Sequence, residues 1–208
     1  QVFGQVDIDM IAGPSEIGII ADESANPVHL AADLLSQAEH DPRARAIMVT
    51  NSEKLANLVS DEVERQLSQL PRESIARPAI ENNSYIAVMD SVEDMFTVMN
   101  EVAPEHLEIQ LPDPMEYMSM VENAGSVFLG RYASEPLGDY VGGTNHVLPT
   151  SGTAKFSSPL GVYDFVKRIS FTQFSRERLQ EVAKDITTLA RTEGLEAHAR
   201  AIEVRFEK

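Results

Sequence analysis

The side chains best suited to acid–base chemistry or metal binding in this chain are its histidines, because their ordinary pKa lies close to neutrality. There are five of them: His29, His40, His106, His146 and His198. The sequence contains no cysteine, which excludes disulfides, thiolate nucleophiles and cysteine-based zinc or iron–sulfur sites from these 208 residues. Any metal ion bound by them would therefore have nitrogen and oxygen ligands.

One candidate ion site lies at the end of a predicted helix. Gln37 and His40 are three residues apart, so their side chains are expected on the same helix face, with Asp33 one turn earlier. This face could hold a cation. A histidine is also favourable at a solvated helix end, where the negative pole of the helix dipole attracts it. Spacing alone favours the solvated helix end over an ion site.

A carboxylate and an imidazole stand next to each other in Glu105 and His106, directly after Pro104. The proline stiffens the turn between a predicted helix and a predicted strand. In an extended stretch adjacent side chains point to opposite sides, so the two groups could serve two different steps of a reaction. An ordinary surface turn is an equally good interpretation.

A glycine-rich segment, residues 138–146, contains Asp139 and His146. Glycine lets the backbone approach a ligand closely, although it could also serve only to turn the chain. The segment is not a dinucleotide fingerprint, because the pattern G-x-G-x-x-G is absent from the whole sequence. A set of imidazole and oxygen ligands suited to zinc or a similar divalent ion could be assembled from the amide oxygen of Gln37 with His40, Asp139 and His198.

Short apolar runs alternate with helical patterns over much of the chain. Predicted strands cover residues 17–21, 46–50, 85–89, 107–109 and 126–130. Predicted helices begin after the N-capping residues Asn26, Ser52 and Ser91. This alternation indicates an α/β fold, a Rossmann-like parallel sheet with helices on both faces. We assign it to a first domain, residues 1–158, which would carry most of the active site.

The rest of the chain follows different patterns. Residues 131–159 lack periodicity, and a loop of that length is usually functional. Residues 166–171 alternate like a half-exposed strand, and residues 175–193 form a predicted helix, followed by a short helix that carries His198. We therefore expect residues 159–208 to form a small, mostly helical C-terminal extension with one strand, which would cross a dimer.

The chain carries 33 acidic and 17 basic side chains, a formal net charge of −16. This charge disfavours nucleic acid and anionic membrane surfaces as partners, since both would repel it. No apolar run approaches the roughly 20 residues that a spanning helix needs, and no basic leader with an apolar stretch opens the sequence. We expect a soluble, cytoplasmic protein, and the start at Gln1 is consistent with a piece of a longer chain.

Six ordered blocks of the sequence closely resemble the histidinol dehydrogenase family. They are residues 9–16 (DMIAGPSE), 33–40 (DLLSQAEH), 103–107 (APEHL), 124–130 (AGSVFLG), 138–140 with 144–150 (GDY and TNHVLPT) and 156–161 (FSSPLG). The blocks are spread over the whole chain, so the resemblance does not depend on one motif. Members of this family are longer, and the sequence is similar to their C-terminal half.

The resemblance implies an enzyme that depends on zinc and NAD. It would oxidise L-histidinol through L-histidinaldehyde to L-histidine, the last step of histidine biosynthesis. It would act as a homodimer, in which the C-terminal helices of one subunit complete the active site of the other. Zinc would mainly bind and orient the substrate, held by Gln37, His40, Asp139 and His198.

By the same resemblance His106 would be the catalytic base, and Glu105 would help to activate the water that adds to the aldehyde. The substrate would be contacted by Ser15, Gln37, His40, His106, Asp139, His146, Glu193 and His198. The NAD-contacting residues of the family lie mostly in its N-terminal half, so the cofactor-binding residues of this chain are unknown and it could be inactive alone. The alternatives are a related dehydrogenase of another polar alcohol and a non-catalytic fragment that binds zinc or imidazole.

Overall fold

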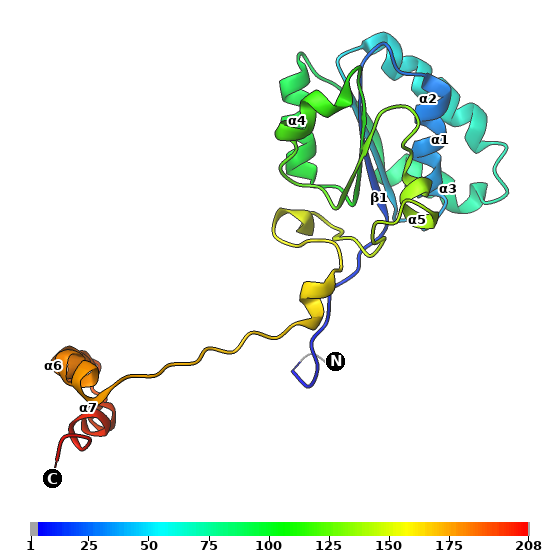
Figure 1. Cartoon of the computed structure of the whole chain (residues 1–208). Coiled ribbons are helices and arrows are strands. Elements are labelled where there is room, and N and C mark those ends of the chain that lie inside the picture. Colours follow the sequence, from blue (N-terminus) through cyan, green and yellow to red (C-terminus); the bar gives the residue numbers. More distant parts are fainter. Residues whose placement is uncertain (1–3, 208) are drawn as a thin grey trace. The chain divides into compact units, whose positions relative to one another are not determined.

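The computed structural model describes residues 4–207, and the chain divides after Phe165 into two compact units (Figure 1). The first unit contains the whole sheet, and the second contains two helices. Glu193 and His198 belong to the second unit, whereas the other predicted site residues belong to the first.

A parallel five-stranded sheet with the order β3-β2-β1-β4-β5 forms the centre of the first unit. The strands are β1 (Glu16–Ala21), β2 (Arg45–Thr50), β3 (Tyr85–Val88), β4 (His106–Gln110) and β5 (Ser126–Leu129). All six residues of β1 are buried, as expected for a central strand covered on both faces, whose apolar run is continuous. The predicted α/β fold with a parallel sheet is confirmed.

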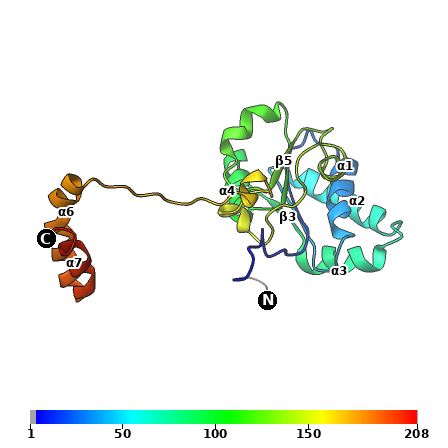
Figure 2. The ribbon, with the colours of Figure 1, turned by 60° about the horizontal axis from the view of Figure 1, so that its bottom comes forward.

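Helices cover both faces of this sheet (Figures 1 and 2). One face is covered by α1 (Pro27–Ala38), α2 (Glu53–Leu67) and α3 (Glu73–Asn83), and the other by α4 (Val92–Val102). Successive residues of β1 alternate between two hydrophobic clusters, so that Ile19 packs with α1 to α3 whereas Ile20 packs with α4.

Side-chain caps fix where three of these helices begin. Asn26, Ser52 and Ser91 each accept a hydrogen bond from a backbone N–H of the first turn, at 2.9, 3.2 and 3.0 Å. The three predicted helix starts are confirmed. The cap of α1 matters most for the site, because the far end of α1 carries Gln37.

The two faces of β4 differ in chemistry. Leu107 and Ile109 point into the apolar cluster with α4. His106, Glu108 and Gln110 lie on the opposite face, and all three are buried. A buried polar face on a central strand costs free energy of folding unless its groups find partners. This face of β4 is therefore a candidate location for a functional site.

The segment after β5 is more regular than its sequence pattern predicts. It contains the short helix α5 (Glu135–Tyr140) and the 3₁₀ turns η2 (Thr153–Lys155) and η3 (Val162–Phe165). A further 3₁₀ helix, η1 (Pro114–Met120), connects β4 to β5. The interpretation of residues 131–159 as a loop without elements of its own is therefore wrong at α5.

The second unit is a pair of packed helices, α6 (Arg176–Thr192) and α7 (Glu196–Glu203). Ala190 of α6 and Ala199 of α7 are buried, and the turn between the helices uses Gly194 at a φ of +75°, which glycine adopts without strain. The predicted strand over residues 166–171 is wrong, because these residues are exposed and pair with no strand in the described part of the chain. Among residues 4–207, no helix combines the length and apolar character needed to cross a membrane.

Candidate active site

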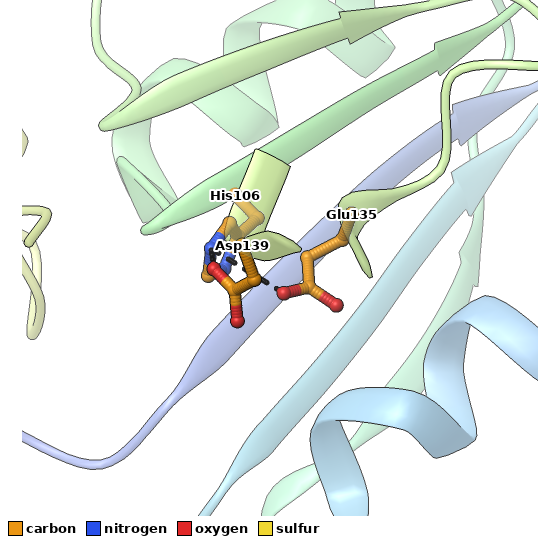
Figure 3. Close-up of side chains that lie close together, drawn as sticks. All are labelled: His106, Glu135 and Asp139. Atoms are coloured by element: carbon orange, nitrogen blue, oxygen red, sulfur yellow. Dashed lines mark ion pairs between the residues drawn. The ribbon is translucent and has the colours of Figure 1, made fainter. Parts of the chain in front are cut away.

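His106 is the centre of the site, at the start of β4 (Figure 3). Its Nδ1 atom lies 3.0 Å from the backbone carbonyl oxygen of Glu16. A carbonyl can only accept, so Nδ1 carries the hydrogen and the lone pair is left on Nε2. Nε2 lies 3.8 Å from Glu135 Oε1 and 4.0 Å from Asp139 Oδ1. Burial lowers the pKa of His106, which keeps the imidazole neutral and able to accept a proton at Nε2.

Glu105 lies beside the imidazole, and the two do not diverge. Its Oε2 atom accepts a hydrogen bond from the backbone N–H of Glu16 at 3.0 Å and lies 3.7 Å from His106 Nδ1. The expectation that the two side chains point to opposite sides is wrong, because Glu105 precedes β4 and is not extended strand. Burial is the main cause that raises the pKa of Glu105 to about 7, followed by the negative charge of Glu16.

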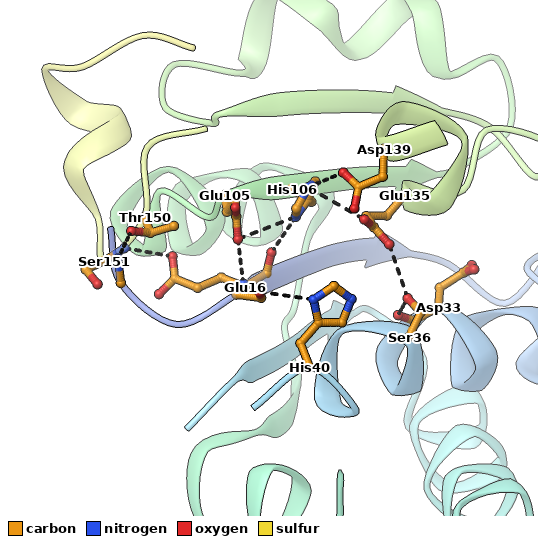
Figure 4. Close-up of polar contacts among 12 residues, drawn as sticks. Glu16, Asp33, Ser36, His40, Glu105, His106, Glu135, Asp139, Thr150 and Ser151 are labelled. Carbon is orange, nitrogen blue, oxygen red and sulfur yellow. Dashed lines mark hydrogen bonds and ion pairs between the residues drawn. The ribbon is translucent and has the colours of Figure 1, made fainter. Parts of the chain in front are cut away.

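Glu16, at the start of β1, connects these two residues to the rest of the fold (Figure 4). Its backbone contacts both Glu105 and His106, as described above. Its buried carboxylate accepts hydrogen bonds from Arg45 at 3.1 Å and from the backbone N–H of Ser151 at 3.1 Å. The strand end, the loop at 150–151 and the two candidate catalytic residues are thus held by one residue.

The end of α1 contributes two very different side chains. Gln37 is fully buried, whereas His40 lies beyond the last residue of the helix and is exposed. His40 Nδ1 lies 3.5 Å from the hydroxyl oxygen of Ser15, just before β1. Gln37 and His40 therefore do not lie on one solvated face. Only His40 fits the interpretation as a residue at a solvated helix end.

Helix α5 adds an acid that sequence reasoning missed, Glu135. Its side chain is buried and lies on the same face of α5 as Asp139, four residues later, so both face His106 (Figures 3 and 4). Burial raises the pKa of Glu135 to about 7, and the negative charge of Asp139 adds to this effect. A signal was present, since Ser134 followed by proline at the second helical position is typical of a helix start.

Four buried side-chain atoms at this place have no hydrogen-bond partner within residues 4–207. They are Oε1 and Nε2 of Gln37, Nε2 of His106 and Oε1 of Glu135. A buried polar atom left unpaired costs about 1–3 kcal/mol. Their grouping fits a bound cation or polar ligand that would satisfy them together, and the nitrogen and oxygen donors fit zinc.

The residues whose possible metal-ligand atoms lie closest together are not the four ligands predicted from the sequence. One ligand atom each from His106, Glu135 and Asp139 can be chosen so that all lie within 4.8 Å of one another. The predicted set shares only Asp139 with this cluster. Because Nε2 has one lone pair, His106 can bind a metal through it or accept a proton through it, but not both at once.

The remaining predicted residues stay predictions. His146 is exposed, on the segment after α5, and makes no hydrogen bond or ion pair with the site residues in the described part of the chain. Glu193, at the end of α6, and His198, on α7, are exposed residues of the second unit. The structure thus brings together Glu105, His106 and Asp139 in one place, and Ser15 with His40 beside Glu16.

The site lies at the amino ends of β1 and β4, since Glu16 and His106 are the first residues of these strands. A separate cavity of about 250 Å³ lies beyond the carboxyl ends of the same strands. It is lined by residues that include Asn26, Gln110 and Arg131. The strand order reverses between β1 and β4, which is where open parallel sheets usually bind ligands, beyond the carboxyl ends.

Comparison with known proteins gives one consistent family. The family model described as histidinol dehydrogenase matches residues 1–206. Histidinol dehydrogenase from Lactiplantibacillus plantarum is 67% identical over 207 residues, and that from Streptococcus mutans is 64% identical over 207 residues. Each alignment covers 100% of this chain and 48% of the relative. The chain therefore spans about half the length of these relatives.

A solved structure agrees with this result. The crystal structure of histidinol dehydrogenase from Elizabethkingia anophelis matches with a TM-score of 0.83 and 42% sequence identity. The match covers 97% of this chain and 46% of that chain. The similarity thus extends across the sheet, the site and the helices that follow.

Proposed function

Because this chain belongs to the histidinol dehydrogenase family, we propose that it forms part of an enzyme that oxidises L-histidinol through L-histidinaldehyde to L-histidine, with NAD as hydride acceptor and with zinc. It would act in the cytoplasm, in the last step of histidine biosynthesis. The observation that carries the proposal is the tautomer of His106. Its Nδ1–H is engaged by Glu16, so that a buried, neutral Nε2 is available beside Glu135 and Asp139.

His106 can serve the first oxidation as the base. The alcohol loses its hydroxyl proton to Nε2 while the hydride on the same carbon leaves for the cofactor, which yields the aldehyde. Nε2 suits this role because burial keeps the ring neutral and the hydrogen bond to Glu16 stabilises the charge that develops on protonation. NAD, when bound, supplies the electrophilic ring that takes the hydride.

Glu105 can serve the second oxidation. Water adds to the aldehyde, and the hydrate then loses a hydride to the cofactor and two protons to become the carboxylate. With a pKa of about 7, Glu105 can take a proton from the attacking water and release it again near neutral pH. Its contact with the Glu16 N–H keeps one oxygen fixed and leaves the other free for water.

Zinc fits the unpaired donors of the site, and we propose the ligands Gln37, His40 and Asp139, with His198 from a second copy of the chain. The buried and unpaired amide of Gln37 supports this set, since a coordinated metal would engage its oxygen. The metal, when bound, would orient the substrate through its imidazole and amino nitrogens. Ser15, His146 and Glu193 would complete the contacts with L-histidinol in the homodimer.

The His106→Asn variant separates the two possible roles of this residue. If His106 is the base, the variant loses the first oxidation but keeps the zinc content of the wild type. His29→Asn is the matched control, because His29 is an exposed histidine on α1 outside the site. Loss of zinc from His106→Asn, with zinc retained in the control, would show that His106 is a ligand and would overturn its role as base.

Formation of NADH tests the activity itself. The chain would be mixed with L-histidinol and NAD, first alone and then with the N-terminal half of a relative added in trans. We expect NADH only in the second mixture. NADH from neither mixture, together with zinc binding, would favour a non-catalytic zinc-binding fragment, and turnover of other polar alcohols in preference to L-histidinol would favour a related dehydrogenase.

A further inference from the structure

Glu108 is a fully buried acid in the middle of β4, two residues after His106 and on the same face of the sheet. Its Oε1 atom accepts a hydrogen bond from the backbone N–H of Glu135 at 2.9 Å. Its Oε2 atom accepts one from the Gln110 amide at 2.9 Å. On α1, Asp33 lies against it, and burial raises the pKa of both carboxyl groups.

The N–H bound by Glu108 belongs to the first residue of α5. The first N–H groups of a helix have no partner within the helix, and a capping side chain usually supplies one. Ser134 occupies the capping position of α5 but makes no side-chain hydrogen bond there. Glu108 therefore supplies from the sheet the acceptor that the local sequence does not.

A second contact between α5 and the sheet involves Gly138. The α-carbon of Gly138 lies so close to Phe128 on β5 that an added Cβ would be 2.7 Å from the ring. Phe128 is the register partner of Glu108 across β4 and β5. The six residues of α5 are too few for a helix that is stable alone, so its place depends on such contacts.

We propose that Glu108 is a positioning residue of the active site, whose buried carboxylate anchors the start of α5 and thereby holds Glu135 and Asp139 opposite His106. The inference rests on the proposed function for its consequence, metal and substrate binding, but the anchoring itself is a property of this chain. A buried acid in a central strand lowers the stability of the fold. The positioning role explains why such an acid is present next to the site.

Three substitutions test the anchor in the full chain. Glu108→Gln keeps an oxygen that can accept from the Glu135 N–H. Glu108→Met removes the acceptor at similar size. Glu108→Asp keeps the carboxyl group but withdraws it by one methylene, and it serves as the second acceptor-shifting variant if the methionine variant does not fold. Ile109→Val is the control, because it weakens packing on the opposite face of the same strand.

Two measurements separate positioning from general destabilisation. The first is hydrogen–deuterium exchange of residues 134–140, compared with exchange in α4, which packs on the opposite face of the sheet. The second is zinc affinity, measured by competition with a chelator. For Glu108→Met and Glu108→Asp we expect at least about tenfold faster exchange in α5 alone and zinc binding weakened by about 10- to 100-fold, the effect typical of residues that orient metal ligands. For Glu108→Gln we expect an exchange rate in α5 and a zinc affinity within about threefold of the wild type, because the glutamine oxygen can still accept the hydrogen bond from the Glu135 N–H.

The outcomes are distinct. Exchange in α5 that rises no more in Glu108→Met and Glu108→Asp than in Ile109→Val would overturn the proposal, as would an equal loss of zinc affinity in the control. A wild-type chain that binds no zinc would count against the proposed metal site. The exchange measurement would then decide on the anchor by itself.

Discussion

The carboxyl group of Glu105 makes the stability of this chain depend on pH in a direction opposite to that of a salt-bridged acid. Its side chain is 12% exposed, and burial raises its pKa from 4.5 to about 7. Between these values the folded chain holds a proton that the unfolded chain releases. The stabilisation from Glu105 is therefore fully present below pH 4.5 and is lost as the pH rises through 7.

The size of this effect follows from the same values. At about 1.4 kcal/mol per pH unit, a rise of the pKa from 4.5 to about 7 corresponds to about 3 kcal/mol of unfolding free energy, most of it lost between pH 5 and pH 8. Glu105→Gln removes the titration but keeps an oxygen for the Glu16 N–H. The variant should therefore lose about 2–3 kcal/mol less than the wild type over this pH range.

Urea unfolding followed by circular dichroism at pH 5, 6, 7 and 8 measures this difference, with a chelator present and ionic strength held constant. Glu122→Gln, which removes an exposed carboxylate, is the control and should follow the wild-type curve. Parallel curves for the wild type and Glu105→Gln would refute the reasoning, because Glu105 would then be as solvated in the folded chain as in the unfolded one.

Three further predictions concern the surroundings of the site. Gly138→Ala should destabilise the chain by about 1–3 kcal/mol, measured by urea unfolding, and weaken zinc binding, because the new Cβ would overlap the Phe128 ring; unchanged values for both would show that α5 moves freely. Gln37→Met should raise the stability of the metal-free chain by about 1–3 kcal/mol, since it replaces an unpaired buried amide, while lowering zinc affinity; a loss of stability would mean that the amide has an internal partner. In the enzyme reconstituted with its N-terminal half, His198→Asn mixed with Glu105→Gln should regain NADH formation through hybrid dimers with one intact site, and failure to do so would argue against a shared site.

The sequence predicted the sheet and the covering helices α1, α2 and α4 because their determinants are local. The capping residues Asn26, Ser52 and Ser91 act within one turn of the helices they start. The run Ile17–Ala21 of β1 contains no polar residue, and all of its residues are buried. Such features can be recognised in the sequence without knowledge of the rest of the fold. The family resemblance then gave the candidate site, which spacing alone left open.

The parts that were missed depend on distant contacts. Helix α5 has a local start signal in Ser134 and the proline after it, but its position is set by contacts with the sheet, namely with Glu108, 27 residues before Glu135, and with Phe128 of β5, so the local pattern does not predict where the helix packs. Helix α3 was not predicted either, and Pro78 within it is unfavourable for a helix on local grounds. The expected strand at 166–171 has the right alternation, but a strand also needs a neighbour for its backbone groups, and alternation says nothing of that.

The location of His106 at the amino edge of the sheet has a consequence for hydride transfer in the proposed reaction. A strand of six residues such as β1 is roughly 20 Å long, at about 3.3 Å per residue. A nicotinamide docked in the crevice beyond the opposite edge, where the strand order reverses, would be separated from the reacting carbon by that whole length. Hydride moves only between atoms in contact. In the proposed reaction the oxidant would therefore have to reach this edge on a surface other than that crevice, and the sheet would be a wall behind the substrate and not the binding site of the coenzyme.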